Sequence, residues 1–170
     1  MAELPLNIAL RDASPARLRL LEPTDVKLLT TFFAEFSEQD RAFFHPHPFD
    51  RETARHCCTH GNSPEQHTVV LEIDSPAPRI AGYGFLWRFQ SDVPLLGLGI
   101  AEPHQGLGIG RTIATWLVEH AGSLAKDGID LTVYKTNHRA VALYASLRFE
   151  PCGETEDGLQ WRMHRKLQVR

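Results

Sequence analysis

An apolar run that leads into alternating glycines constrains this chain more than any other segment. Residues 94–101 are almost entirely apolar, and Gly106, Gly108 and Gly110 follow closely. Apolar residues then recur from Ile109 onward with the 3.6-residue period of an amphipathic helix. An unbroken apolar run is typical of a strand that is covered on both faces. The segment therefore predicts a buried strand, a glycine loop and a helix in direct succession.

The start of this helix is a predicted anion-binding site. N–H groups in the first helical turn have no partner within the helix, the helix dipole adds positive charge there, and glycines let a phosphate approach the backbone. The spacing does not fit a P-loop, since Gly110 is followed by Arg111 and Thr112. It does not fit the dinucleotide fingerprint either, because the pattern that begins at Gly106 has Arg111 at its last glycine position.

A second pattern lies further along the chain. Residues 129–133 predict a strand, and residues 137–147 predict a helix that carries Asn137, Ala140 and Tyr144. At about 100° per residue, Asn137 and Tyr144 share one helix face, with Ala140 between them. Taken alone, Asn137 is also typical of a helix N-cap, and Tyr144 of a buried core residue.

Together the two patterns resemble the GNAT superfamily of acetyl-CoA-dependent N-acetyltransferases. Gln105, Gly108 and Gly110 match its Q/R-x-x-G-x-G/A loop. Residues 137–149 are similar to its N-x-x-A-x-x-L-Y-x-x-x-G-F signature, with Arg148 in place of the glycine. Glycine at a helix end supplies left-handed backbone, so Arg148 indicates a strained or lengthened helix end.

The resemblance implies one N-acetyltransferase domain over residues 1–170, with the motif-bearing part at about 17–167. The implied architecture is an α/β (α+β) fold of the GNAT-like acyl-CoA N-acyltransferase type, with a mixed central sheet flanked by helices. The remaining patterns agree with it. They predict strands at residues 17–21, 68–73, 80–89 and 159–167, helices at 25–36 and 50–60, and an ordered aromatic loop at 40–50.

The resemblance also assigns a cofactor site and a general acid. The loop and the second helix would hold acetyl-CoA, and the Tyr144 hydroxyl would protonate the departing thiolate of coenzyme A. Backbone N–H groups of residues 98–100 would meet the oxyanion, where Gly97 and Gly99 permit a bulge. Arg111 and Arg139 either meet coenzyme A phosphates or stay exposed. The predicted cofactor-binding residues are Leu98, Ile100, Gln105, Gly106, Gly108, Gly110, Arg111, Asn137 and Ala140.

The residue that deprotonates the acceptor amine stays open. Glu102 at the end of the buried strand is the predicted base, and Glu72, His45, His47 or a chain of water molecules are alternatives. His45, His47 and Glu72 are predicted to bind the acceptor. His56 and His60 have the i,i+4 spacing of zinc ligands, but the sequence fixes no further ligand beside them, so no metal is expected.

Composition limits the compartment and the partners. Of the 170 residues, 42% are hydrophobic, and Lys+Arg 18 against Asp+Glu 21 gives a net charge of −3. This balance argues against a nucleic-acid binder, and no apolar stretch approaches the ~20 residues of a membrane span. The N-terminus lacks the pattern of a signal peptide, and three irregularly spaced cysteines are no disulfide framework. These features predict a cytoplasmic protein.

Two functions follow from the resemblance. The first is acetyl transfer from acetyl-CoA to a primary amine by direct attack, on a small molecule or a peptide. The second is a catalytically silent acyl-CoA-binding module that acts as a sensor or a partner subunit. Retention of both Asn137 and Tyr144 favours the enzyme. Dimerisation is frequent in the family, so a homodimer is compatible with either function.

Overall fold

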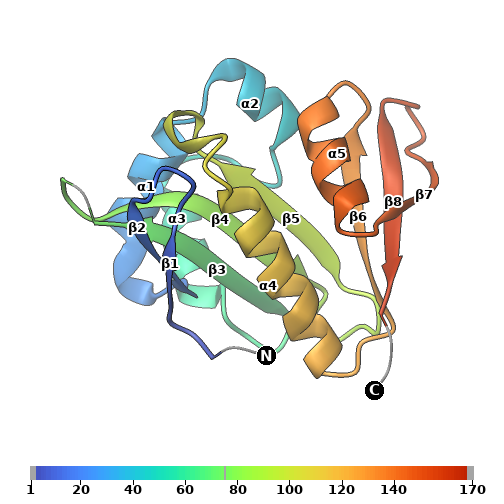
Figure 1. The fold of residues 1–170 in the computed structure, drawn as a ribbon, viewed down its shortest axis with the longest axis horizontal. Coiled ribbons are helices and arrows are strands. Elements are labelled where there is room, and N and C mark those ends of the chain that lie inside the picture. Colours follow the sequence, from blue (N-terminus) through green and yellow to red (C-terminus); the bar gives the residue numbers. More distant parts are fainter. Residues whose placement is uncertain (1–2, 75, 168–170) are drawn as a thin grey trace.

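The computed structural model describes residues 3–74 and 76–167. Its centre is a mixed eight-stranded sheet in the order β1-β2-β3-β4-β5-β6-β8-β7 (Figure 1). All neighbouring strands are antiparallel except β5 and β6, which are parallel. The strands are β1 (Leu6–Ala9), β2 (Pro15–Leu20), β3 (Gln66–Ile73), β4 (Arg79–Trp87), β5 (Leu95–Ile100), β6 (Gly128–Tyr134), β7 (Glu150–Glu154) and β8 (Gln160–Lys166).

Helices cover both faces of the sheet. On one face α1 (Val26–Ala34) and α3 (Arg51–His60) pack together, and α1 lies on β4. On the other face α4 (Ile109–Ser123) crosses β4 and β5 (Figure 1). Two shorter helices, α2 (Glu38–Phe43) and α5 (His138–Ser146), and two 3₁₀ turns at Pro23–Asp25 and Glu102–His104 complete the chain.

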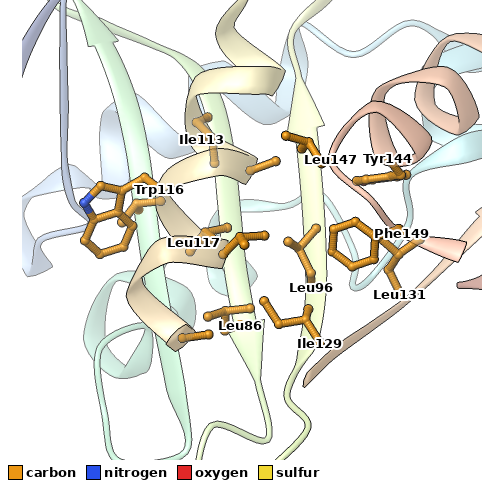
Figure 2. Close-up of a cluster of buried hydrophobic side chains, with 14 of the residues drawn as sticks. Leu86, Leu96, Ile113, Trp116, Leu117, Ile129, Leu131, Tyr144, Leu147 and Phe149 are labelled. Carbon is orange, nitrogen blue, oxygen red and sulfur yellow. The ribbon is translucent and has the colours of Figure 1, made fainter. Parts of the chain in front are cut away.

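Each face has its own apolar core. The apolar stripe of α4, with Ile113 and Leu117 fully buried, packs on β4 and β5, and this core continues to Tyr144 and Phe149 at the end of α5 (Figure 2). The opposite core is largely aromatic. Its fully buried rings include Phe32, Phe33, Tyr83 and Phe85. Burial on both faces explains the apolar runs of β3 and β4. The predicted burial of β5 is only partly correct, because Leu95, Gly97, Leu98 and Ile100 are half-buried.

The two parallel strands separate almost at once. Among the described residues of β5 and β6, Leu95 and Asp130 form the single paired position. The Pro94 carbonyl accepts the Asp130 N–H at 3.0 Å, so Pro94 faces β6. Alternate residues of a strand direct their backbone groups to the same edge, so Leu98 and Ile100 face the gap. The splay therefore leaves their N–H groups and the Leu98 C=O available to a ligand, while the Ile100 C=O accepts from the Gln105 side chain.

The predicted bulge at Gly97 and Gly99 is absent. The register between β4 and β5 runs without a shift from Gly82–Ile100 to Trp87–Leu95. The two glycines serve close packing instead, because a Cβ on Gly97 would lie 2.0 Å from the Phe85 ring and a Cβ on Gly99 would lie 2.5 Å from the Phe44 ring.

The mixed α/β fold class and the order of the predicted elements are confirmed. Three elements were not predicted: β1, α2, which occupies part of the expected aromatic loop, and β7. None of the helices in the described part of the chain is long and apolar enough to cross a membrane.

Candidate functional site

A groove of about 650 Å³ opens beside the splayed strands. We call it the main groove. Its walls come from α2, from the glycine loop before α4, and from the first turns of α5, and Leu98 and Ile100 of β5 line it. The segments that carry the two sequence patterns therefore meet around one hollow.

The glycine loop presents bare backbone to the main groove. Gly106 and Gly108 have positive φ angles of 85° and 90°, which a residue with a side chain rarely adopts. A Cβ on Gly106 would meet nothing within 4 Å, so this stretch of backbone is open. Gly108 is the N-cap of α4, and the helix begins at Ile109. The start of this 15-residue helix therefore has the geometry that the predicted anion site requires, with first-turn N–H groups that have no partner within the helix.

The Gln105 side chain connects three elements around the groove. Its Nε2 donates to Asp40 Oδ1 of α2 at 3.0 Å and lies 3.4 Å from the Ile100 carbonyl. Its Oε1 accepts from the Arg139 guanidinium of α5. Arg139 therefore contacts the glycine loop through Gln105. Arg111 of α4 donates to Ser146 Oγ at the end of α5 at 2.8 Å, and this hydrogen bond connects the two helices.

Arg11 is a cationic residue of the groove that sequence reasoning missed. It lies in the turn between β1 and β2, and its N–H donates to the Leu107 carbonyl at 3.2 Å. Its guanidinium contacts the Gly106 carbonyl at 3.4 Å, and its side chain packs beside Gly108. No local pattern marks this residue, because it reaches the loop only through the pairing of β1 with β2.

Asn137, Ala140 and Tyr144 lie on one face of α5, as predicted. The Asn137 side chain caps the helix, with Oδ1 accepting from the Ala140 N–H at 3.1 Å. This leaves its Nδ2 hydrogens for other partners. Tyr144 is 6% exposed and belongs to the core, and burial raises its pKa above the ordinary tyrosine value. The N-cap and core interpretations are thus correct, and all three residues also line the groove.

A second hollow of about 250 Å³ adjoins the main groove, and we call it the side cavity. Six residues line both hollows and mark their junction: Phe43, Phe44, Leu98, Asn137, Ala140 and Tyr144. Beyond the junction the side cavity extends between β4, β5 and β6. Tyr144 therefore lies at the junction of the two hollows.

The two histidines of the aromatic segment lie in different places. His45 lines the side cavity, with Nδ1 3.2 Å from the Arg41 carbonyl and Nε2 3.5 Å from the Tyr134 hydroxyl. His47 lines neither hollow. It packs on Phe33 in the aromatic core, where burial lowers its pKa, and its Nε2 lies 3.7 Å from Cys57 Sγ.

The two predicted glutamates are also separated. Glu102 is exposed in the 3₁₀ turn after β5 and lines the main groove. Glu72 is buried in the sheet and lines neither hollow. Its carboxylate accepts from Arg17 at 2.7 Å and from Arg19, which also binds Asp25 at 2.6 Å. Burial would raise the pKa of Glu72, but the hydrogen bonds from both arginines lower it.

Comparisons of sequence agree with this arrangement. Residues 29–149 match the Acetyltransferase (GNAT) family. A Bacillus subtilis (strain 168) protein with the provisional name ribosomal protein bS18-alanine N-acetyltransferase is 28% identical over 91 residues. The match covers 54% of this chain and 58% of that relative, so it spans little more than half of the relative's length.

Solved structures share the fold over most of the chain. The GNAT domain of S. lividans PAT is 18% identical, with a TM-score of 0.78 over 98% of this chain and 100% of that chain. Mycobacterium smegmatis RimJ in complex with CoA-disulfide is 14% identical, with a TM-score of 0.75 over 95% and 86%. Spermidine N-acetyltransferase from Vibrio cholerae, in complex with CoA and spermine, is 22% identical, with a TM-score of 0.70 over 89% and 95%.

The family match covers both sequence patterns, the main groove joins the segments that carry them, and the neighbouring structures have the same fold. The chain therefore belongs to the acetyltransferase (GNAT) family, whose enzymes use acetyl-CoA to acetylate an amine.

Proposed function

We propose that this protein transfers the acetyl group of acetyl-CoA to a primary amine by direct attack, with Tyr144 as the general acid. One observation carries the proposal: Tyr144 lies where the main groove and the side cavity meet. A donor in the groove and an acceptor in the cavity would both reach this hydroxyl. Proximity of this kind lowers the barrier of a two-substrate reaction by holding both partners in place.

The main groove fits the donor. The open backbone at Gly106 and the start of α4 suit a pyrophosphate, and the cationic side chains of Arg11, Arg111 and Arg139 line the same groove. The Nδ2 group of Asn137 is free to donate to an amide carbonyl of the donor. When bound, acetyl-CoA supplies an activated thioester, whose C–S bond breaks as the amine nitrogen forms its bond to the acetyl carbon.

Tyr144 has the protonation state that a general acid needs. A phenol with an ordinary pKa of about 10 is protonated at neutral pH, and burial of Tyr144 moves its pKa further up. The hydroxyl would give its proton to the leaving sulfur. The backbone N–H groups of Leu98 and Ile100, which face the splay, would stabilise the negative charge that develops on the acetyl oxygen.

His45 is the proton acceptor that the geometry supports best. A backbone carbonyl only accepts hydrogen bonds, so the contact from Nδ1 to the Arg41 carbonyl places the proton of neutral His45 on Nδ1. Nε2 then carries the lone pair, on the side of the cavity-lining Tyr134. Glu102, which lines the main groove, is the alternative base. We do not include Glu72 in the proposed site, because its carboxylate is paired with two arginines.

The test is acetyl-CoA-dependent release of free thiol by the full-length protein, measured with a panel of amines, with mass spectrometry of the products. We expect amine-dependent release and a product heavier by one acetyl group. A silent acyl-CoA-binding module would bind acetyl-CoA in a calorimetric titration and release thiol at the same slow rate with and without every amine.

A further inference from the structure

The side cavity has an aromatic wall that is built into the sheet. Phe85 and Trp87 of β4 stack with ring centroids 4.3 Å apart and an angle of 20° between the planes. Phe44 approaches Phe85 at 6.4 Å from the segment after α2. All three rings line the cavity. A ligand body that enters the cavity would therefore rest on flat apolar surfaces.

Two glycines of β5 make this wall possible. Any side chain at Gly97 would overlap the Phe85 ring, and any side chain at Gly99 would overlap Phe44. β5 thus has no side chain at the two positions where the rings of Phe85 and Phe44 pack against it. Tyr134 adds a further ring to the cavity, and Phe43 approaches it at 5.9 Å.

The same cavity is without formal charge. Among the described residues that line it, none is Asp, Glu, Lys or Arg. The polar groups are the side chains of His45, Thr132, Asn137 and Gln160, the hydroxyls of Tyr134 and Tyr144, and the Trp87 indole N–H, which is buried without a hydrogen-bond partner in the described part of the chain. Two acidic residues line the adjoining main groove: Asp40, which already accepts from Gln105 and from Ser37 Oγ at 2.9 Å, and the exposed Glu102. A ligand with a second ammonium group would lose its hydration in the cavity without meeting a counter-charge.

We infer that the acceptor is a monoamine whose body is aromatic or otherwise flat and apolar, and that this body occupies the side cavity. The inference rests on the proposed function and names the substrate class of the same site. The single amine would point to the junction at Tyr144, and the body would pack on Phe85 and Trp87; His45 lines the same cavity on the side of Tyr134. Polyamines and aminosugars would be poor acceptors, because their additional ammonium or hydroxyl groups would be buried against rings.

The first experiment compares acceptors at saturating acetyl-CoA. 2-Phenylethylamine and tryptamine represent the inferred class, cadaverine and spermidine the polyamines, glucosamine the sugars, and a peptide with an N-terminal alanine the protein acceptors. We expect kcat/KM for the aromatic amines to exceed that for each of the others at least about tenfold. Preference for a polyamine, a sugar or the peptide would overturn the inference and leave the proposed function standing.

A charge variant tests the cavity directly. Gln160→Glu places a carboxylate in the side cavity with almost no change in volume, and Gln90→Glu adds the same charge at an exposed turn. We expect Gln160→Glu to raise the ratio of kcat/KM for cadaverine to that for 2-phenylethylamine at least about fivefold, and Gln90→Glu to leave the ratio unchanged. Equal ratios in both variants would contradict an acceptor body in this cavity.

A binding measurement separates the inference from the proposed function. 2-Phenylethylamine should quench the fluorescence of Trp87 in a saturable manner, and the Trp87→Phe variant should lose that signal. Saturable quenching without acetyl transfer would refute the proposed acetyltransferase activity but support binding of an aromatic monoamine in the side cavity. Transfer to 2-phenylethylamine without any Trp87 signal would place the acceptor elsewhere and refute the inference.

Discussion

The ring of Tyr144 packs edge-on against Phe149, with ring centroids 5.7 Å apart and an angle of 67° between the planes. The end of α5 enforces this contact. The Phe149 N–H donates to the Tyr144 carbonyl at 3.0 Å, and the Arg148 N–H donates to the Ala145 carbonyl at 2.9 Å, which is the Schellman closure of a helix. Helix termination therefore fixes the orientation of the proposed general acid (Figure 2).

Removal of the Tyr144 hydroxyl should slow the chemical step. We expect Tyr144→Phe to lower kcat about 10²-fold with little change in the KM for acetyl-CoA, because a positioned general acid contributes at least that much. Steady-state kinetics of thiol release measures both parameters. Tyr83→Phe is the matched control, since Tyr83 is fully buried and lines neither hollow. An unchanged kcat in Tyr144→Phe would remove the acid role.

The pH dependence gives a second readout of the same prediction. Burial raises the pKa of Tyr144, so the phenol keeps its proton up to and beyond the ordinary value of about 10. The kcat of the wild type should therefore show no loss that depends on Tyr144 between pH 7 and about pH 10. An alkaline limb in this range that disappears in Tyr144→Phe would contradict this protonation state.

Arg148 occupies a backbone conformation that glycine adopts more easily. Its φ is 62°, so the helix end is strained rather than lengthened, and α5 stops at Ser146. Arg148→Gly should raise the free energy of unfolding by up to about 1 kcal/mol, since left-handed backbone costs a side-chain-bearing residue about that much. Thermal unfolding should shift upward by about 2–4 °C.

A matched variant separates this effect from loss of an exposed arginine. Arg55→Gly, in the middle of α3, should lower stability by about 1 kcal/mol because glycine disfavours a helix interior. A destabilised Arg148→Gly would show that the side chain, and not the backbone strain, dominates at this position.

Local patterns predicted the parts of the site that are continuous in sequence. Gln105, Gly106, Gly108 and Gly110 lie between a strand and a helix, and Asn137 and Tyr144 share a helix face, as their local spacing predicted. The resemblance to the GNAT superfamily, and not spacing, assigned both groups to one cofactor site. Backbone hydrogen bonding and helical periodicity act over a few residues, which is the range that a sequence pattern records.

Residues that act through long-range pairing could not be predicted in this way. Arg11 reaches the glycine loop only because β1 pairs with β2. Glu72 was predicted to bind the acceptor. In the structure its carboxylate pairs with Arg17 and Arg19 on the neighbouring strand β2, so it forms part of the sheet. Gly97 was predicted to permit a bulge, but in the structure it makes room for the ring of Phe85 on the neighbouring strand β4.

The identity of the base is testable with two variants. His45→Gln should lower kcat/KM for the amine about 10²-fold, because the Nε2 lone pair that would accept the proton is lost. Glu102→Gln should stay within about twofold of the wild type, since an exposed carboxylate outside the side cavity contributes little to proton transfer there. A larger loss in Glu102→Gln would transfer the role to Glu102.

Glu72 should matter for stability and not for catalysis. Glu72→Gln leaves Arg19 with Asp25 alone and should lower the free energy of unfolding by about 1–3 kcal/mol, with kcat/KM near the wild-type value. Because the pKa of Glu72 is lowered in the fold, its contribution is present above about pH 4.3 and is lost as the pH falls further. Chemical denaturation of the wild type and of Glu72→Gln, above and below about pH 4.3, measures the difference in their free energies of unfolding.

The comparison for Glu72 is the exposed Glu156, whose replacement by Gln should leave the free energy of unfolding unchanged. If Glu72→Gln instead kept its stability and lost activity, the carboxylate would have to reach the acceptor after all.

Arg11 should bind the donor without taking part in the chemistry. Its guanidinium lies at the Gly106 carbonyl, on the rim where the phosphates of acetyl-CoA would enter. Arg11→Met should raise the KM for acetyl-CoA about twofold to fivefold, the effect of one exposed charge, and leave kcat unchanged. Arg162→Met, an exposed change on β8 outside both hollows, should change neither the KM for acetyl-CoA nor kcat. Because mobile ions screen an exposed cation, added salt should raise the wild-type KM more than that of Arg11→Met. Parallel salt responses in the two proteins would mean that Arg11 serves only to hold the β1–β2 turn against the loop.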